Sequence, residues 1–278
     1  NVRVTAFWSG YPGPSVWDLL DGPRTLGLVP AEYRAMRVAA LKHAADFARQ
    51  LGLPAIITHL GFIPEEPANP LFAELVAAVR EIALHAQQQD VAFWFETGQE
   101  TPVTMLRLIE AVGTDNLGIN LDPANLILYG KGNPIDALDV FGACVRNVHA
   151  KDAFYPTDPM RLGREVKVGD GRVRFPEFVR RLEELGFHGE YIIEREISGA
   201  QGVGGVIEVH AGEWLLDYTT NLRYYPPGQP LPGKHQMLLE FEDCSALVAT
   251  VQMWGGMMCH LPDEPTGMID ADMARQRP

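Results

Sequence analysis

Short apolar runs alternate with longer amphipathic segments along the first 200 residues of the chain. The runs have the length and the β-branched and aromatic content of buried strands. We predict strands at residues 2–8, 55–60, 91–96, 117–122, 145–149 and 190–196. The segments between them carry apolar residues at helical spacing, and we predict helices at residues 31–51, 71–88, 134–142 and 176–185, with another that begins at Thr101-Pro102. Strands that alternate with helices of this length form a parallel sheet, so the pattern favours an α/β fold of about six strand–helix units.

The pattern changes after Gly199. Residues 201–278 lack a helical period in their centre and carry short apolar runs separated by turn residues. We predict strands at residues 206–209, 221–225, 236–241 and 246–253, paired antiparallel, and a frayed polar end from residue 261. The chain is therefore expected to divide near residue 200 into an α/β domain (1–200) and a small β-rich segment (201–278).

Four polar residues mark the ends of four successive strands: Glu96, Asp122, His149 and Glu194. A single acid at a strand end is usually a cap or turn residue. Four in successive units converge, because the carboxyl ends of parallel strands share one edge of the sheet. Three carboxylates and one imidazole suit a divalent cation, and we expect Mn²⁺, Mg²⁺ or Co²⁺, with Zn²⁺ also open.

Composition limits the partners and the compartment. The net charge of -13 argues against nucleic acid as a partner, since phosphate contacts need a basic surface. No apolar run is long enough to span a bilayer. The three cysteines show no metal-binding spacing, which favours a reduced, cytoplasmic protein. The first residues contain neither an initiating Met nor a signal peptide, so a fragment or processed product is expected.

Six stretches resemble the sugar phosphate isomerase/epimerase family, the xylose-isomerase-like metal barrels. In the order that this family has them, they are HLGFIP (59–64), FETGQ (95–99), NLDPANLILYG (120–130), VHAKD (148–152), GREVKVGDGRVRF (163–175) and IIEREISG (192–199). The resemblance implies a (β/α)8 TIM barrel of which residues 1–200 supply strands three to eight. By this resemblance, we expect the first two strand–helix units and the last helix of the family's barrel to be missing here.

The same resemblance implies a metal-dependent sugar or sugar-phosphate isomerase or epimerase that moves a proton next to a carbonyl. Glu96, Asp122, His149 and Glu194 match the family's metal ligands, and Glu96 and Glu194 would also exchange the proton. Arg164 lies in the loop after strand seven, where the family has a substrate-contacting arginine, and Arg161 in the same loop is the alternative. We also consider His59, Asn125 and Lys151 as contacts to a small sugar or sugar derivative. Their structural alternatives are a hydrogen-bonded strand-end histidine, a turn asparagine, and a surface ion pair of Lys151 with Asp152.

The C-terminal segment has a different resemblance. Residues 205–260, chiefly AGEWLLDYTTNLRYYPPGQPLPGKHQMLLEFEDCSALVATVQMWGG (211–256), resemble part of the N-terminal domain of formamidopyrimidine-DNA glycosylase. Residues 201–278 carry ten Asp and Glu against four Lys and Arg, which is the wrong charge for gripping DNA.

The sequence is also compatible with two other functions. One is a phosphodiesterase like endonuclease IV, which shares the barrel but needs further histidine ligands; here only His59 and His149 lie at barrel strand ends. The other is a non-catalytic fusion with a glycosylase-like module, in which the truncated barrel is inactive. The missing units would leave strands 2–8 and 190–196 as open edges, so we expect self-association, for instance as a homo-oligomer.

Overall fold

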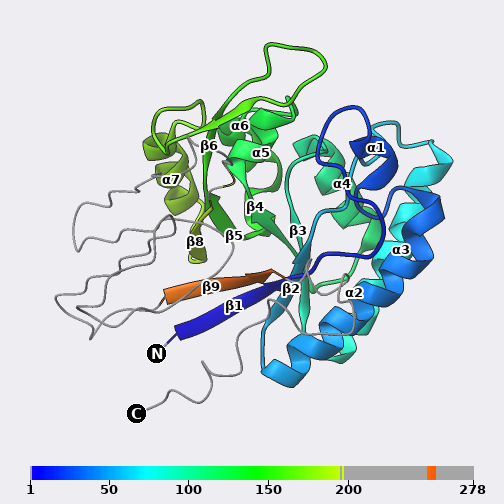
Figure 1. Cartoon of the computed structure of the whole chain (residues 1–278). Coiled ribbons are helices and arrows are strands. Elements are labelled where there is room, and N and C mark those ends of the chain that lie inside the picture. Colours follow the sequence, from blue (N-terminus) through cyan, green and yellow to red (C-terminus); the bar gives the residue numbers. More distant parts are fainter. Residues whose placement is uncertain (1, 195, 197–248, 255–278) are drawn as a thin grey trace, which may run out of the picture.

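A computed structural model describes residues 2–194, 196 and 249–254 of the chain (Figure 1). Its centre is a curled sheet in which every neighbouring pair of strands is parallel. The strand order is β8 (Glu190–Ile193), β5 (Val145–Ala150), β4 (Leu117–Leu121), β3 (Ala92–Glu96), β2 (Ala55–Thr58), β1 (Val2–Trp8) and β9 (Ala249–Trp254). The six strands from β1 to β8 in this order form a partial TIM barrel, as the sequence predicts.

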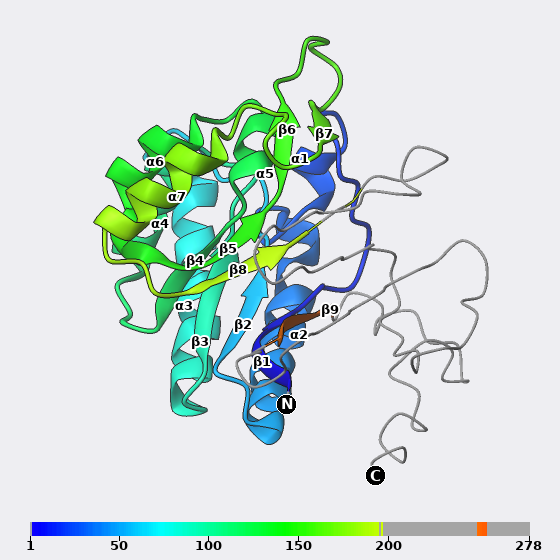
Figure 2. The same ribbon diagram turned by 90° about the vertical axis from the view of Figure 1, so that its left-hand side faces the viewer.

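Helices cover the outer face of the sheet (Figure 2). The longer ones are α2 (Ala31–Leu51), α3 (Pro70–Gln88), α4 (Pro102–Val112), α6 (Pro134–Phe141) and α7 (Phe175–Glu184). Shorter turns are α1 (Gly22–Thr25), α5 (Pro123–Leu128) and the 3₁₀ helix η1 (Gly142–Cys144). The predicted helices are present to within one residue at their starts. Gly52 ends α2 in a left-handed conformation, as its place after an apolar stripe indicates.

Side chains of the strands alternate between two apolar layers. Phe7, Ile56 and Phe93 point toward the helices and belong to the main core. Ala6, Trp8 and their neighbours form a second, smaller cluster, on the inner face of the curl. The period-two alternation therefore fixes which strand residues reach the interior of the barrel.

One part of the sequence-based assignment is incomplete. The loop predicted after residue 149 contains an antiparallel pair, β6 (Asp152–Phe154) and β7 (Arg164–Val166). Each strand has three residues, which is too short to show a period of two. The short helix α5 was missed for the same reason, because six residues do not establish a helical period.

The strand predicted at residues 246–253 is present as β9, but the antiparallel pairing predicted for it is wrong. It pairs parallel with β1, from Val2 opposite Ala249 to Trp8 opposite Trp254. It also contacts β8, at the other end of the sheet, without pairing with it. Strand β1 is therefore not an edge of the described sheet, and its residue Ala6 is buried. Among the described strands, β8 is an edge of the sheet, as predicted.

The remaining predictions for the C-terminal segment concern residues outside the described ranges. These are the strands at 206–209, 221–225 and 236–241 and the polar end from 261. The domain boundary near residue 200 stays a prediction. Within the described ranges, we find no helix with both the length and the apolar character needed to cross a membrane.

Candidate metal centre

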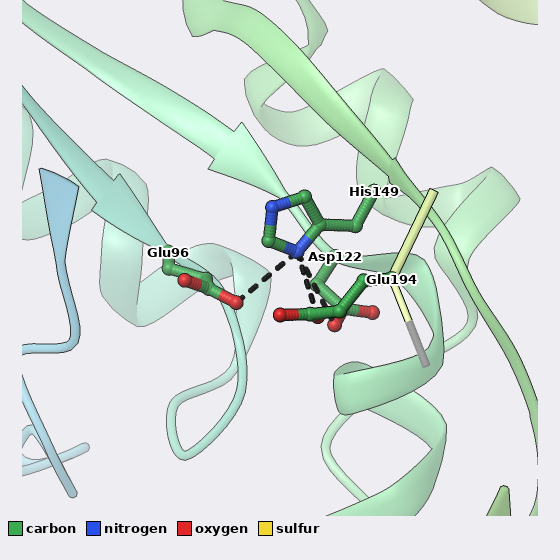
Figure 3. Close-up of side chains that lie close together, drawn as sticks. All are labelled: Glu96, Asp122, His149 and Glu194. Atoms are coloured by element: carbon green, nitrogen blue, oxygen red, sulfur yellow. Dashed lines mark ion pairs between the residues drawn. The ribbon is translucent and has the colours of Figure 1, made fainter. Parts of the chain in front are cut away.

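Four polar side chains meet at the carboxyl ends of neighbouring strands (Figure 3). We call Glu96, Asp122, His149 and Glu194 the ligand cluster. One potential ligand atom of each lies within 4.8 Å of the other three. His149 Nδ1 is their common point, at 3.2 Å from Glu96 Oε1, 2.9 Å from Glu194 Oε2 and 3.7 Å from Asp122 Oδ2. The structure thus brings together the four residues singled out at the strand ends.

Local hydrogen bonds orient Asp122. Its Oδ1 accepts from the Asn125 backbone N–H at 2.9 Å, so it caps the N-terminus of α5. The Thr97 hydroxyl donates to the Asp122 carbonyl at 2.8 Å and accepts from the Asp122 N–H at 2.9 Å. Thr97 fixes the backbone of Asp122, and the N-terminus of α5 binds Oδ1, so Oδ2 is the oxygen that faces the cluster.

Glu96 is held from two sides. The indole N–H of Trp8, at the end of β1, donates to Glu96 Oε2. His59 Nε2 lies 3.4 Å from Oε1, and the His59 ring packs edge-on against Trp17 at 4.9 Å between ring centroids. His59 therefore lies directly beside the ligand cluster, and Trp17 covers its ring.

The second nitrogen of His149 faces Asn120, whose amide Nδ2 lies 3.0 Å from Nε2. Asn120 Oδ1 is buried and has no hydrogen-bond partner among the described residues. A half-turn of this amide would let Oδ1 accept from a protonated Nε2, so that Nδ1 would be unprotonated and able to bind a metal. Asn120 can therefore set the tautomer that a metal at Nδ1 requires.

Burial and neighbouring charges shift the pKa values within the cluster in different directions. Burial alone would raise the pKa of the Glu96 carboxyl, but His59 and His149 outweigh it and hold this pKa well below its usual range. At Glu194 burial dominates and raises the pKa, although His149 and Lys151 oppose it. Burial would lower the pKa of the His149 imidazole, yet Glu194 and Glu96 raise it well above its usual value. A proton is therefore held among these groups, and a metal would displace it on binding.

Lys151 is buried beside the cluster and is not the surface partner of Asp152. Its ammonium lies 3.3 Å from Asp122 Oδ2 and 3.2 Å from Glu194 Oε2, and it donates to Glu196 Oε2. It also donates to Asn125 Oδ1 at 3.3 Å. The carboxylates raise the pKa of Lys151 well above its usual value against the opposite effect of burial. Both Lys151 and Asn125 thus lie at the site.

The structure does not bring Arg164 to the ligand cluster. Arg164 is exposed on β7, and its guanidinium carbon lies 5.0 Å from the centroid of the Phe154 ring. The neighbouring Asp152 has a structural role, since it accepts backbone N–H groups of Gly169, Gly171 and Val173 at 3.0 to 3.1 Å. This carboxylate fixes the loop that follows the β6–β7 hairpin.

The sequence analysis did not identify two residues of the site, Asn120 and Glu196. For Lys151 it allowed both a substrate contact and a surface ion pair with Asp152. Each of these three site residues lies two positions from a member of the ligand cluster. Residues two apart on a strand point to the same face, so this spacing was a usable signal. The role of Thr97 could not be predicted in this way. Its hydroxyl bonds the Asp122 backbone, and these two residues come from different strand ends that are adjacent only in the folded sheet.

The residues present fit one divalent cation. All four ligands are 5% exposed or less, so without a counter-charge three carboxylates would lie buried close together. Their oxygens and one imidazole nitrogen form a donor set that suits a hard or borderline metal. Cysteine, which would favour a structural zinc site, is absent from the ligand cluster.

Comparison with known proteins shows the family. The model of the xylose isomerase-like TIM barrel family matches residues 7–217, about three quarters of the chain. A curated relative from Methanocaldococcus jannaschii, an uncharacterized protein, is 26% identical over 176 residues. The match covers 59% of this chain and 58% of that relative, so the chain spans less than two thirds of the relative's length.

Solved structures agree with this assignment. A xylose isomerase domain protein from Planctomyces limnophilus is 44% identical, with a TM-score of 0.66 over 69% of this chain and 71% of that one. A xylose isomerase-like TIM barrel protein from Mycobacterium smegmatis, solved in complex with magnesium, is 21% identical, with a TM-score of 0.52 over 62% and 64%. A D-tagatose 3-epimerase-like protein is 22% identical, with a TM-score of 0.53 over 70% and 72%.

The resemblance of residues 205–260 to a DNA glycosylase is not supported by these comparisons. Apart from residues 249–254, that segment also lies outside the described ranges. The functional argument therefore rests on the α/β part of the chain.

Proposed function

Since the chain belongs to the xylose isomerase-like TIM barrel family, we propose that it is a metal-dependent sugar isomerase or epimerase. The reaction would move a proton at a carbon next to a carbonyl. The observation that carries this proposal is the buried ligand cluster at the carboxyl ends of β3, β4, β5 and β8. A structural neighbour is described as D-tagatose 3-epimerase-like, which agrees with a small sugar or sugar derivative as the substrate.

Glu96, Asp122, His149 and Glu194 would hold the metal. When bound, a divalent cation would polarise the substrate carbonyl and stabilise negative charge on its oxygen. Asn120 would keep Nδ1 of His149 directed at the metal through Nε2. We propose Mn²⁺, Mg²⁺ or Co²⁺, and a relative with bound magnesium supports this choice of hard cation.

Glu96 and Glu194 would also move the proton. They approach His149 Nδ1 from separate strand ends, at 3.2 and 2.9 Å. Two carboxylates supplied by different strands can lie on different sides of a bound sugar. One can remove the proton while the other returns it to the same or a neighbouring carbon.

We also propose that His59 and Asn125 contact sugar hydroxyls next to the metal. In support, His59 Nε2 lies 3.4 Å from Glu96 Oε1, and the Asn125 N–H donates to Asp122 Oδ1. Arg164 would have to reach the site from the β6–β7 hairpin, where it now lies over Phe154.

Metal content tests the ligand assignment. Protein purified without chelator should contain about one equivalent of divalent metal per chain. Both Glu96→Gln and His149→Ala should lower this content, because each removes one donor. Glu66→Gln, which changes an exposed acid, is the matched control. Unchanged metal in both cluster variants would refute the assignment.

Solvent deuterium tests the reaction. Incubation of candidate keto sugars in D₂O with the metal-loaded protein should place deuterium next to the carbonyl. Glu194→Gln should slow this exchange by about 10²-fold or more, the usual contribution of a positioned acid or base. Exchange at the full rate in a folded, metal-loaded Glu194→Gln variant would exclude Glu194 as a proton-transfer group.

A further inference from the structure

Two N–H donors of the chain flank the ligand cluster. On the β1 side, the indole of Trp8 donates to Glu96 Oε2. On the β8 side, the ammonium of Lys151 lies within 3.3 Å of Asp122 Oδ2 and Glu194 Oε2. Trp8 therefore engages the second oxygen of Glu96, whereas Lys151 contacts the same oxygens of Asp122 and Glu194 that face His149 Nδ1. A second metal that shared Asp122 and Glu194 through these oxygens would have to take the place of the ammonium.

Oxygen atoms surround the ammonium of Lys151, as they would surround a bound metal cation. Besides Asp122 and Glu194, it contacts Glu196 Oε2 and, at 3.3 Å, Asn125 Oδ1. An ammonium has three N–H donors, and Lys151 donates to Glu194 Oε2, Glu196 Oε2 and Asn125 Oδ1, so all three are used. Lys151 is 1% exposed, and no hydrogen of its ammonium is left for a substrate. This arrangement favours a counter-charge over the substrate contact considered for Lys151 from the sequence.

We propose that Lys151 occupies the position of a second divalent cation and, with Trp8 on the opposite flank, limits the site to a single metal. The inference rests on the metal centre of the proposed function. In two-metal sites the ions lie about 3.5–4 Å apart and share carboxylate ligands. Here a second ion that shared Asp122 and Glu194 would have to displace a buried ammonium.

Charge balance indicates that the ammonium and a second metal would compete for the same carboxylates. Glu96, Asp122, Glu194 and Glu196 supply four negative charges around the site. One divalent metal and the Lys151 ammonium neutralise three of them, and two divalent metals without the ammonium would neutralise all four. Lys151 therefore substitutes for an ion that the carboxylates could otherwise accommodate.

The consequence is a choice of reaction class. Paired metals serve in-line displacement at phosphodiesters, where they stabilise both the attacking and the leaving oxygen. A single metal beside two carboxylates suits polarisation of one carbonyl and transfer of a proton. By excluding a second metal, Lys151 would disfavour phosphodiester hydrolysis, the alternative function considered from the sequence.

Metal stoichiometry of Lys151 variants tests the inference. After equilibration with Mn²⁺ or Zn²⁺ and removal of excess metal, the unchanged protein should hold about one ion. Lys151→Met, which keeps the length of the side chain without its charge, should hold about two. Lys151→Arg should stay at one because it retains the charge. Lys131→Met removes a lysine outside the cluster and is the matched control.

A second variant covers the case in which Lys151→Met does not fold. Glu196→Gln removes a half-exposed partner of Lys151 and leaves the ligand cluster intact. The ammonium, with one fewer counter-charge, should repel the metal more strongly and weaken its binding by on the order of tenfold. Calorimetric titration with Mn²⁺ measures this change.

The outcomes separate the two proposals. If the unchanged protein binds no metal, the proposed function fails and this inference fails with it. If the unchanged protein and folded Lys151→Met both bind one ion with equal affinity, only the inference is overturned. An unchanged affinity in Glu196→Gln would overturn it as well.

Discussion

The Glu100 side chain is a buried acid close to the site but outside the ligand cluster. Its Oε1 accepts from the Gly98 N–H at 3.2 Å, and its Oε2 has no hydrogen-bond partner among the described residues. Burial raises the pKa of Glu100 to about 7, against the opposing effect of His59. An acid with a raised pKa is neutral in the folded protein over a pH range in which it is ionised in the unfolded chain.

This shift predicts a pH-dependent stability. Below pH 4.5, the ordinary pKa of a glutamic acid, Glu100 is neutral in both states and the free energy of unfolding is highest. As the pH rises from 4.5 to about 7, only the unfolded chain loses this proton, so the free energy of unfolding falls. Glu100→Gln keeps an acceptor for Gly98 and carries no charge. It should therefore raise the free energy of unfolding by about 3 kcal/mol at pH 8, and change it little at pH 4.5. Urea denaturation of both proteins at these pH values measures the difference, and an equal effect at both would contradict the shifted pKa.

The position of a site residue could be predicted from the sequence where it depends only on its place at the end of a strand. The four members of the ligand cluster follow from the shared edge of a parallel sheet. The environment of Lys151 was not predictable in the same way, since its spacing also fits a surface pair with Asp152. Only the fold brings Asn125 and Glu196 around its ammonium.

At the scale of elements, two glycines lock the loops that follow β1 and β2. Gly27 and Gly61 both have positive φ, and a Cβ on Gly61 would lie 2.2 Å from the Leu26 carbonyl oxygen. The Leu28 N–H donates to the Leu60 carbonyl at 2.9 Å across the same contact. This close approach fixes the segment that carries His59 beside Glu96.

Gly61→Ala should therefore be costly. The added methyl group meets backbone, so the loops must separate, and we expect a loss of about 2–4 kcal/mol in unfolding free energy. Gly52→Ala is a matched control, because Gly52 has a similar positive φ of 68° but nothing within 4 Å of a Cβ. It should cost only about 1 kcal/mol. Chemical denaturation measures the free energy of unfolding of both variants. An equal decrease in both would show that the close approach at Gly61 does not contribute to stability.

The prediction of elements succeeded where apolar periodicity spans enough residues. The predictions for α2 and α3 agree with the structure because each has about five turns of amphipathic pattern. β6 and β7 were missed because each has only three residues, which is too short to show a period of two. Parallel pairing of β9 could not be predicted either, since a strand far along the chain finds its partner only in the folded sheet.

At the scale of the whole molecule, the described structure is a half-barrel whose β1 side is protected. β9 pairs with β1 along its length, so β1 is not the open edge that the missing strand–helix units would leave. The described sheet now ends at β8 and β9. The self-association expected from an open β1 should therefore depend on whether β9 stays paired.

The double variant Thr250→Pro/Val251→Pro tests this dependence. N–H groups of successive strand residues point to opposite sides, so one of these two must face β1, and proline removes both. We expect a loss of about 3 kcal/mol in unfolding free energy, together with self-association through the uncovered edge. The control Thr250→Val/Val251→Thr retains both N–H groups and two β-branched side chains. Light scattering and thermal unfolding compare the variants. If the proline variant stays monodisperse with the melting temperature of the control, β9 does not protect β1, and the half-barrel must be stable with that edge open.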